Sequence, residues 1–314
     1  MFRKIATVKN LASIGGGPIG AGWAAHFLAQ GYKVRSYIHS KTEEDAYRNI
    51  VEIAWESLIE LGLSKTASLK NLNITDDLEE VLYEADFVQE SIPELLKIKQ
   101  DFYQLLGTKV PKDVIIASST SGLTMTSIQK RCETSERTVI GHPFNPPYLL
   151  PLVEIVGGER THPAALDWAC KFYQHAGKQP LKLIKEIPGF IATRLQEALW
   201  REALHMVDSG EATPEQIDIA LINGPGPRMT VQGQCMAFHV ACGEGGMATN
   251  LDQFGPALEL PWTRLKAPAL TKDLRNKMVN GCNEMAGGQH FSEMARKRDK
   301  SIAAILKALN SANL

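Results

Sequence analysis

The chain has 314 residues, of which 44% are hydrophobic and 22% charged, with a formal net charge of -1. This length is enough for two domains with a sizeable core, and the composition is that of a soluble globular protein rather than a disordered one. A balanced charge without a long basic run argues against a nucleic-acid or anionic-membrane surface, so we expect a small-molecule partner.

Cysteine usage and the N-terminal segment indicate the compartment. The cysteines are scattered without a metal-ligand spacing, so we expect neither zinc nor a disulfide. The segment after Met1 has no signal-peptide core, and no stretch approaches the roughly 18 apolar residues of a membrane span. We therefore expect a cytoplasmic location. The cysteines are Cys132, Cys170, Cys235, Cys242 and Cys282.

Short apolar runs alternate with amphipathic stretches from residue 10 to about residue 187. This alternation is typical of strand-helix-strand units and predicts an α/β fold with a Rossmann-type, doubly wound and mostly parallel sheet. Helices are expected at 21–30 and 43–61. Strands are expected at 11–14, 33–37, 87–90, 114–118, 138–142, 151–156 and 180–184.

The first expected strand runs directly into a glycine-rich turn. Gly15, Gly17 and Gly20 have the spacing of the dinucleotide fingerprint, in which absent side chains let backbone N–H groups and a helix N-terminus approach a pyrophosphate. Pro18 and Ile19 complete the turn. We predict that these five residues bind a nicotinamide dinucleotide.

The end of the second expected strand departs from that fingerprint. An acidic residue usually accepts hydrogen bonds from the adenine ribose there, but this chain has Ile38, followed by His39, Ser40 and Lys41. An acidic side chain repels a 2′-phosphate, whereas His39, Ser40 and Lys41 could attract one. NADP therefore remains a candidate cofactor beside NAD. Alternatively, these residues form a solvated turn, and backbone contacts determine which cofactor binds.

Polar residues also follow the next two expected strands. Glu94 comes after strand 87–90, with Lys99 behind it, although a salt bridge on a helix face would account for both equally well. Ser121 follows strand 114–118 and could donate to a substrate oxygen, or it could belong to a serine-rich turn. Ligands bind at such strand ends in open α/β sheets.

A histidine and a glutamate then occur on neighbouring expected strands. His142 ends the strand at 138–142, and Glu154 lies on the strand at 151–156. A histidine can take a proton from an alcohol, and an adjacent carboxylate can fix its tautomer and support the resulting imidazolium. The pair predicts alcohol oxidation next to a hydride acceptor.

The remaining part of the chain has helical periodicity. We expect residues 1–187 to form the dinucleotide-binding domain and residues 188–314 an all-helical domain. The pattern predicts a helix at 191–207, and Thr213-Pro214-Glu215-Gln216 has the form of a capping box. Turns are expected at 224–227 and 243–246.

Several motifs together resemble the 3-hydroxyacyl-CoA dehydrogenase superfamily, in its order and over nearly the whole chain. Besides the glycine-rich start, they are Gln-Glu-Ser-Ile-Pro-Glu (89–94), Ser-Ser-Thr-Ser-Gly-Leu (118–123), Gly-His-Pro-Phe-Asn-Pro (141–146), Pro-Leu-Val-Glu-Ile-Val (151–156) and Pro-Gly-Phe-Ile-Ala-Thr-Arg-Leu (188–195). Within the superfamily, segments 195–205 and 253–263 are most similar to the branch that oxidises L-carnitine at C3.

This resemblance implies a Rossmann domain, a helical domain that forms a homodimer, NAD as cofactor, and oxidation of L-carnitine to 3-dehydrocarnitine. It implies that His142 is the base, Glu154 its partner, Ser121 the donor to the substrate oxygen, and Glu94 and Lys99 residues on the cofactor side.

Two positions depart from the superfamily pattern. Thr193 stands where acyl-CoA enzymes have Asn, so that substrate contact does not carry over directly. Ile38 stands where the carnitine-oxidising members usually have Asp. The resemblance therefore predicts the reaction of this chain more directly than its preference for NAD.

Carnitine carries a quaternary ammonium, which cannot donate a hydrogen bond, so aromatic faces and a carboxylate are expected to recognise it. Phe144 is the first candidate because it lies two residues from His142, and Glu197 and Trp200 follow on one helix. Asn145, Thr193 and Phe254 are further substrate-binding candidates. Other aromatic candidates are Tyr148, Phe238 and Trp262, and Arg194 or Arg228 could bind the substrate carboxylate.

Other functions stay open at this point. An L-gulonate 3-dehydrogenase or a short-chain 3-hydroxyacyl-CoA dehydrogenase would use the same redox residues with a different pocket. A non-catalytic dinucleotide-binding protein would retain the fold without turnover; the intact His142 and Glu154 count against it, whereas Ile38 and Thr193 count modestly for it.

Overall fold

A computed structural model describes residues 2–230, 233–242, 244, 246–254, 256, 260, 262, 263, 269, 271–274, 276, 280, 289 and 291–311. Its contacts divide the chain into two compact units, Met1–Thr193 and Arg194–Leu314. No described helix has both the length and the apolar character that crossing a membrane requires.

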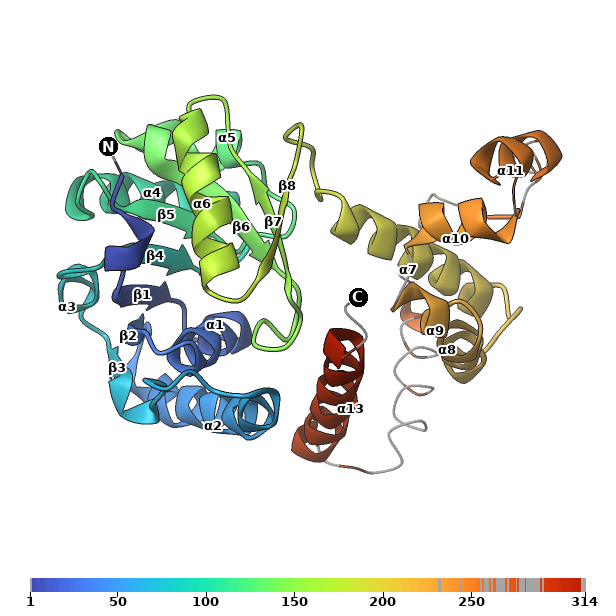
Figure 1. Ribbon diagram of the computed structural model, residues 1–314, viewed down its shortest axis with the longest axis horizontal. Helices are drawn as coiled ribbons and strands as arrows, with labels where there is room; N and C mark the ends of the chain where they lie inside the picture. The colour runs from blue at the N-terminus through green and yellow to red at the C-terminus, as the bar shows by residue number, and fades with distance from the viewer. Residues whose placement is uncertain are drawn as a thin grey trace. The chain divides into compact units, whose positions relative to one another are not determined.

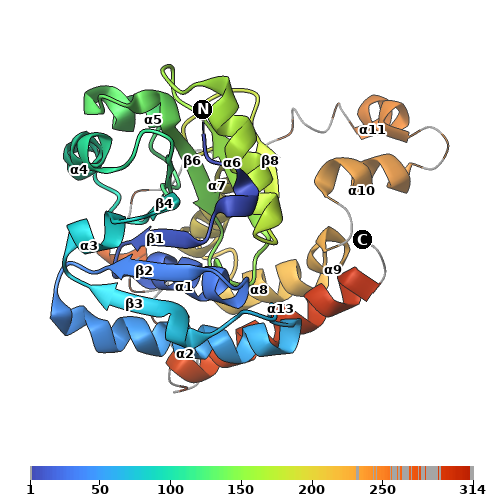
Figure 2. The same cartoon turned by 60° about the vertical axis from the view of Figure 1, so that its left-hand side comes forward.

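The first unit is built on an eight-stranded sheet with the order β3-β2-β1-β4-β5-β6-β7-β8 (Figure 1, Figure 2). Neighbouring strands are parallel except for the antiparallel pair β6 and β7. The predicted α/β class and mostly parallel sheet are confirmed. The strands are β1 (Asn10–Ile14), β2 (Lys33–Tyr37), β3 (Leu72–Thr75), β4 (Phe87–Glu90), β5 (Ile115–Ser118), β6 (Thr138–Pro143), β7 (Leu152–Val156) and β8 (Gln179–Lys182).

Strand β3 and helix α4 are among the elements that lie where none was predicted. Strand β3 is a short edge strand in which only Ile74 is buried, so it gives no apolar run. Helix α4 (Leu96–Lys109) buries only a few side chains, which gives a weak periodic signal. Because both elements are half-exposed, their positions depend on the sheet rather than on a strong local pattern.

Helices cover both faces of this sheet. The first helix, α1, begins at Pro18 rather than at residue 21, because proline at the first helical position has no N–H to leave unsatisfied. The helices of the unit are α1 (Pro18–Ala29), α2 (Glu44–Leu61), α3 (Leu78–Leu82), α4, α5 (Met125–Ile128) and α6 (Pro163–His175), with short 3₁₀ turns η1 (Ile5–Thr7), η2 (Lys41–Glu43), η3 (Leu69–Asn71), η4 (Gln129–Arg131) and η5 (Ser135–Arg137).

Successive residues of the central strand β4 face opposite layers of helices. The ring of Phe87 lies 4.3 Å from that of Phe172 in α6, in a cluster that also holds Phe27 of α1. Val88 belongs instead to the core that includes Tyr103 of α4. This alternation follows from the two-residue repeat of a strand. The next two side chains of β4, the polar Gln89 and Glu90, therefore also point to opposite faces of the sheet.

The described residues of the second unit form helices and connecting segments, as predicted. Thr213 and Gln216 make the predicted capping box at the start of α8. The turn predicted at 224–227 is only partly right, because Gly226 already begins α9. Cys282 and Gly243 lie outside the described residues. The helices are α7 (Ala192–Asp208), α8 (Pro214–Asn223), α9 (Gly226–Met229), α10 (Gln234–Ala241), α11 (Gly246–Phe254) and α13 (Phe291–Ser311).

Candidate active site

Four parallel strands of the first unit bring the predicted site segments to one edge of the sheet. The carboxyl ends of β1, β4, β5 and β6 lie at the same edge, and the strand order reverses between β1 and β4. Ligands bind in the crevice at such a reversal. The glycine-rich turn, the turn at Ser91, the loop 119–122 and His142 lie at these strand ends.

The glycine-rich turn fits a dinucleotide pyrophosphate. Gly15 has φ 128°, and a Cβ there would overlap the carbonyl oxygen of Ser91, so only glycine permits this turn. Gly17 is the N-cap of α1 without a side-chain cap, and a Cβ on it would meet nothing within 4 Å. The helix N-terminus therefore has open space beside it and no side-chain cap, and the first N–H groups of a helix have no partner within the helix, which suits an anion.

His142 and Glu154 are directly paired across β6 and β7. His142 Nδ1 lies 2.9 Å from Glu154 Oε2, and their side chains are 6% and 0% exposed. Because an ionised carboxylate can only accept, Nδ1 carries the hydrogen and donates it. The lone pair is then on Nε2, which is the atom able to accept a substrate proton.

The second oxygen of Glu154 is also occupied. Its Oε1 accepts hydrogen bonds of 2.9 Å from the backbone N–H groups of Ile191 and Ala192, where α7 begins. Burial alone would raise the pKa of the Glu154 carboxyl, but the hydrogen bonds from His142 and from this backbone outweigh it, and the pKa lies below its ordinary value. The dyad therefore keeps a negative charge beside the imidazole.

Two aromatic rings hold the imidazole of His142. The ring of Phe144 lies 4.9 Å away, and that of the fully buried Phe190 lies 5.5 Å away. Sequence reasoning missed Phe190. The signal was the glycine before it: Gly189 has φ 73° and turns the chain so that Phe190 enters the core.

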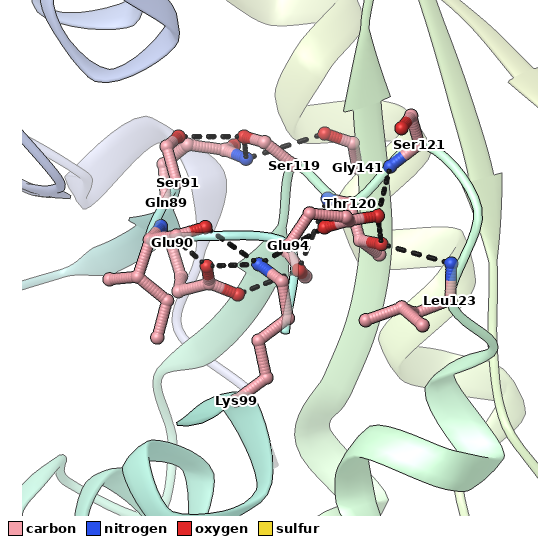
Figure 3. Close-up of polar contacts among 12 residues, drawn as sticks. Gln89, Glu90, Ser91, Glu94, Lys99, Ser119, Thr120, Ser121, Leu123 and Gly141 are labelled. Atoms are coloured by element: carbon pink, nitrogen blue, oxygen red, sulfur yellow. Dashed lines mark hydrogen bonds and ion pairs between the residues drawn. The ribbon is translucent and has the colours of Figure 1, made fainter. Parts of the chain in front are cut away.

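Glu94 organises the loop that contains Ser121 (Figure 3). Its Oε1 accepts the backbone N–H groups of Ser121 at 3.1 Å and Gly122 at 3.2 Å, as well as the hydroxyl of Thr120. Ser121 itself is exposed. The structure thus joins two predicted residues, because a carboxylate from the turn after β4 fixes the loop after β5.

Lys99 forms a buried ion pair with Glu90, close to Glu94 (Figure 3). The Lys99 Nζ and Glu90 Oε1 are 2.6 Å apart, with side chains 1% and 0% exposed, and Lys99 Nζ lies 3.7 Å from Glu94. Glu90 Oε2 accepts the hydroxyl of Ser118 at 2.6 Å. Lys99 therefore supports the ends of β4 and β5 rather than offering a free cation.

Ser119 is a hydrogen-bonding centre that sequence reasoning missed. Its Oγ accepts from the Trp23 indole at 3.1 Å and the Gln89 amide at 2.8 Å, and it shares a 2.8 Å hydrogen bond with Ser91 Oγ. Gln89 also donates to the carbonyl of Gly141 at 3.3 Å. The network joins α1, β4, β5 and β6 next to the predicted base, and only the serine-rich composition of 118–121 hinted at it.

A buried lysine, Lys178, donates hydrogen bonds to the loop after Phe144. Lys178 Nζ donates to the carbonyls of Pro147 and Leu150 and lies 5.4 Å from the centre of the Trp23 ring. Burial lowers the pKa of Lys178 from 10.5 to about 7. Its charged form is therefore costly in the folded chain.

Lys178→Met is expected to change the pH dependence of stability. Because the folded pKa of about 7 lies below the unfolded value of 10.5, the unfolded chain binds more protons between these values, and wild-type stability rises with pH across that window. Relative to Lys178→Met, the wild-type free energy of unfolding should gain about 1.36 kcal/mol per pH unit, or about 2 kcal/mol from pH 7.5 to pH 9.

Urea unfolding at several pH values measures this difference. Losing the donor to both carbonyls adds a cost for Lys178→Met that does not vary with pH, so the slope is the diagnostic quantity. The exposed Lys171→Met is the control and should show no slope. A flat difference for Lys178→Met would mean that Lys178 stays charged throughout.

The other predicted residues lie in varied environments. Ile38 is fully buried, Ser40 accepts from the Thr42 N–H and caps η2, and His39 and Lys41 are exposed. Asn145 is exposed and Thr193 half-buried.

The second-unit candidates stay predictions. Glu197 and Trp200 are exposed on α7, with Glu197 3.8 Å from Arg201. Phe254 ends α11, and its side chain lies outside what the structure describes.

Comparison with known proteins identifies the family. Residues 10–187 match the NAD binding domain of 3-hydroxyacyl-CoA dehydrogenase, and residues 189–288 match its C-terminal domain. The chain belongs to the 3-hydroxyacyl-CoA dehydrogenase family. It is therefore an oxidoreductase with an NAD-binding Rossmann domain.

Similar family members extend over nearly the whole chain. The L-carnitine dehydrogenase of Streptomyces coelicolor is 51% identical, with 96% of this chain and 95% of the relative aligned. The L-carnitine dehydrogenase of Pseudomonas putida is 45% identical, with 98% and 96% aligned.

Solved structures of similar proteins have the same fold. An NAD⁺-dependent 5-formyl-3-hydroxy-2-methylpyridine 4-carboxylic acid 5-dehydrogenase superposes with a TM-score of 0.83 at 27% identity, covering 97% of this chain and 99% of that one. The 3-hydroxybutyryl-CoA dehydrogenase of Escherichia coli has a TM-score of 0.64 at 26% identity, covering 88% and 57%.

Proposed function

We propose that this family member oxidises the C3 hydroxyl of L-carnitine to 3-dehydrocarnitine with NAD. The observation that carries the proposal is the alignment with L-carnitine dehydrogenases at 44–51% identity along 96–98% of the chain. The His142–Glu154 pair supports it, since a base next to a dinucleotide site is what alcohol oxidation requires.

In the proposed mechanism, His142 Nε2 accepts the proton of the substrate hydroxyl. Bound NAD supplies a hydride acceptor at C4 of its nicotinamide. Glu154 holds Nδ1–H at 2.9 Å and stabilises the imidazolium while the proton is on Nε2. Ser121, whose backbone is fixed by Glu94, holds the substrate oxygen through its exposed hydroxyl. The hydrogen bonds to Glu154 fix its carboxylate, and with it the imidazole, before the reaction begins. No free energy is therefore spent on orienting the imidazole during proton transfer.

For the trimethylammonium group we propose Phe144 as a recognition face. Its half-buried ring already touches the imidazole, so a substrate with its hydroxyl at Nε2 extends along this ring. A quaternary ammonium is attracted by the face of an aromatic ring, and the attraction is strongest where water is excluded.

A substrate screen tests this function. L-carnitine, L-gulonate and 3-hydroxybutyryl-CoA are offered with NAD and with NADP, and we expect the highest kcat/KM for carnitine with NAD. The neutral isostere 3-hydroxy-5,5-dimethylhexanoate, in which carbon replaces the ammonium nitrogen, should lose roughly 10-fold or more in kcat/KM. Faster turnover of gulonate or the thioester would reassign the substrate, and NADH binding without turnover of any alcohol would indicate a non-catalytic protein.

We also propose that residues 188–314 form the substrate and dimerisation domain of a cytoplasmic homodimer. Apolar side chains are exposed on its helices, including Leu195 at 66% on α7 and Ile222 at 66% on α8. Large exposed apolar side chains are typical of surfaces that another chain covers.

A further inference from the structure

The position that normally selects NAD has no polar group in this chain. In dinucleotide-binding folds an acidic residue at the end of the second strand accepts hydrogen bonds from the adenine ribose. Here that residue is Ile38, directly after β2, and it is fully buried. Ile38 therefore contributes to the core, and the ribose hydroxyls need an acceptor from elsewhere.

A carboxylate from a different position lies at the glycine-rich turn. A Cβ built on Gly16 would overlap Glu43 Oε2 and would lie 3.6 Å from Ile38 Cγ2. The Glu43 carboxylate thus lies against Gly16, the residue between Gly15 and Gly17 of the fingerprint. It also lies near Ile38, the position where an acidic residue is usual. A side chain at position 16 would meet the end of the Glu43 side chain and would displace that carboxylate from the turn.

The backbone holds Glu43 in this place. Ser40 caps η2 through the Thr42 N–H, and the Glu43 N–H donates to the Ser40 carbonyl at 2.9 Å. Helix α2 begins at the next residue, Glu44, so Glu43 lies between two ordered turns. The local backbone therefore directs the Glu43 side chain toward the glycine-rich turn.

The Glu43 carboxylate accepts no hydrogen bond and makes no ion pair within the described part of the chain, although the residue is half-buried. The adjacent Glu44 differs, because its carboxylate lies 2.6 Å from Arg48. A half-buried carboxylate without a donor has unused acceptor capacity, and it faces the turn where the dinucleotide binds.

We propose that Glu43 accepts hydrogen bonds from the adenine ribose hydroxyls of NAD, taking over the role of the acidic residue absent at position 38, and thereby disfavours NADP. The 2′-phosphate of NADP would lie next to this carboxylate, and two negative charges at that distance repel each other. The exposed His39 and Lys41 are the groups that oppose this discrimination. The inference rests on the NAD binding domain and is independent of the alcohol that the enzyme oxidises.

Glu43→Gln tests the proposal by equilibrium binding of NADH and NADPH, measured by calorimetry. Losing a charged hydrogen-bond acceptor should raise the Kd for NADH roughly 10–100-fold, while the Kd for NADPH falls or stays the same. Glu43→Asp keeps the charge but shortens the reach, so it should weaken NADH binding and still reject NADPH. Glu44→Gln is the matched control and should bind both as the wild type does.

Two outcomes would overturn the inference. One is wild-type NADH affinity and wild-type rejection of NADPH in Glu43→Gln. The other is an equal loss in Glu43→Gln and Glu44→Gln, which would indicate a general effect of charge near η2. Circular dichroism of each variant separates misfolding from a binding effect.

Discussion

Replacing His142 with Gln is expected to lower kcat for the alcohol by about 10²–10⁴-fold, the usual contribution of a positioned general base. The Gln side chain can still hydrogen-bond to Glu154, but it cannot take up the substrate proton near neutral pH. NADH binding should stay within a few-fold of wild type, because the glycine-rich turn is built from β1 and α1 rather than from β6. Stopped-flow turnover and calorimetry measure the two quantities separately.

The exposed His175→Gln, on α6, is the matched control and should leave both quantities unchanged. Glu154→Gln should reduce kcat as well, because an amide can donate to Nδ1 and so favour the tautomer in which Nε2 carries the hydrogen. Equal losses of turnover and NADH binding in His142→Gln would contradict the assignment and would point to a structural role for the histidine.

Lys99→Met is expected to cost about 3–5 kcal/mol in the free energy of unfolding, because it leaves the fully buried Glu90 carboxylate without its cation. The Glu90 carboxylate would then retain the hydroxyl of Ser118 and the backbone N–H of Ile92 as hydrogen-bond donors, but no cation. Urea unfolding of the purified variant measures the loss.

Lys97→Met supplies the comparison two residues away. Lys97 pairs with Asp101 on the surface with a side chain that is 73% exposed, so its removal should cost less than about 1 kcal/mol. Adding Glu90→Gln to Lys99→Met removes the stranded charge and should restore part of the stability. If Lys99→Met costs no more than Lys97→Met, the buried pair is not the stabilising element that its geometry implies.

Local patterns were sufficient for much of the fold and for the base. The strands β2 and β4 coincide with the predicted segments. Buried residues alternate with more exposed ones along β2, and β4 begins with the apolar pair Phe87 and Val88. The pairing of His142 with Glu154 was also predictable, since antiparallel neighbours joined by a short loop lie opposite each other. The edge strand β3 was missed because it buries too little to give a pattern.

Several site contacts depended on long-range packing. Ser119 collects donors from Trp23 and Gln89, and Lys178 reaches the carbonyl of Leu150. Phe190 enters the core beside His142 after a left-handed glycine. No local periodicity encodes such contacts, because each requires the sheet to bring distant segments together.

The sequence by itself determined the Rossmann architecture, the glycine-rich turn and the histidine–glutamate pair, because short-range spacing and strand periodicity specify all three. Only the tertiary structure decided how charges are distributed around them. It enclosed Lys99 with Glu90, turned Glu94 into the anchor of the Ser121 loop, and brought Glu43 to Gly16. Solvation and pairing of an ionisable side chain depend on its three-dimensional neighbours, which a linear pattern of residues does not contain.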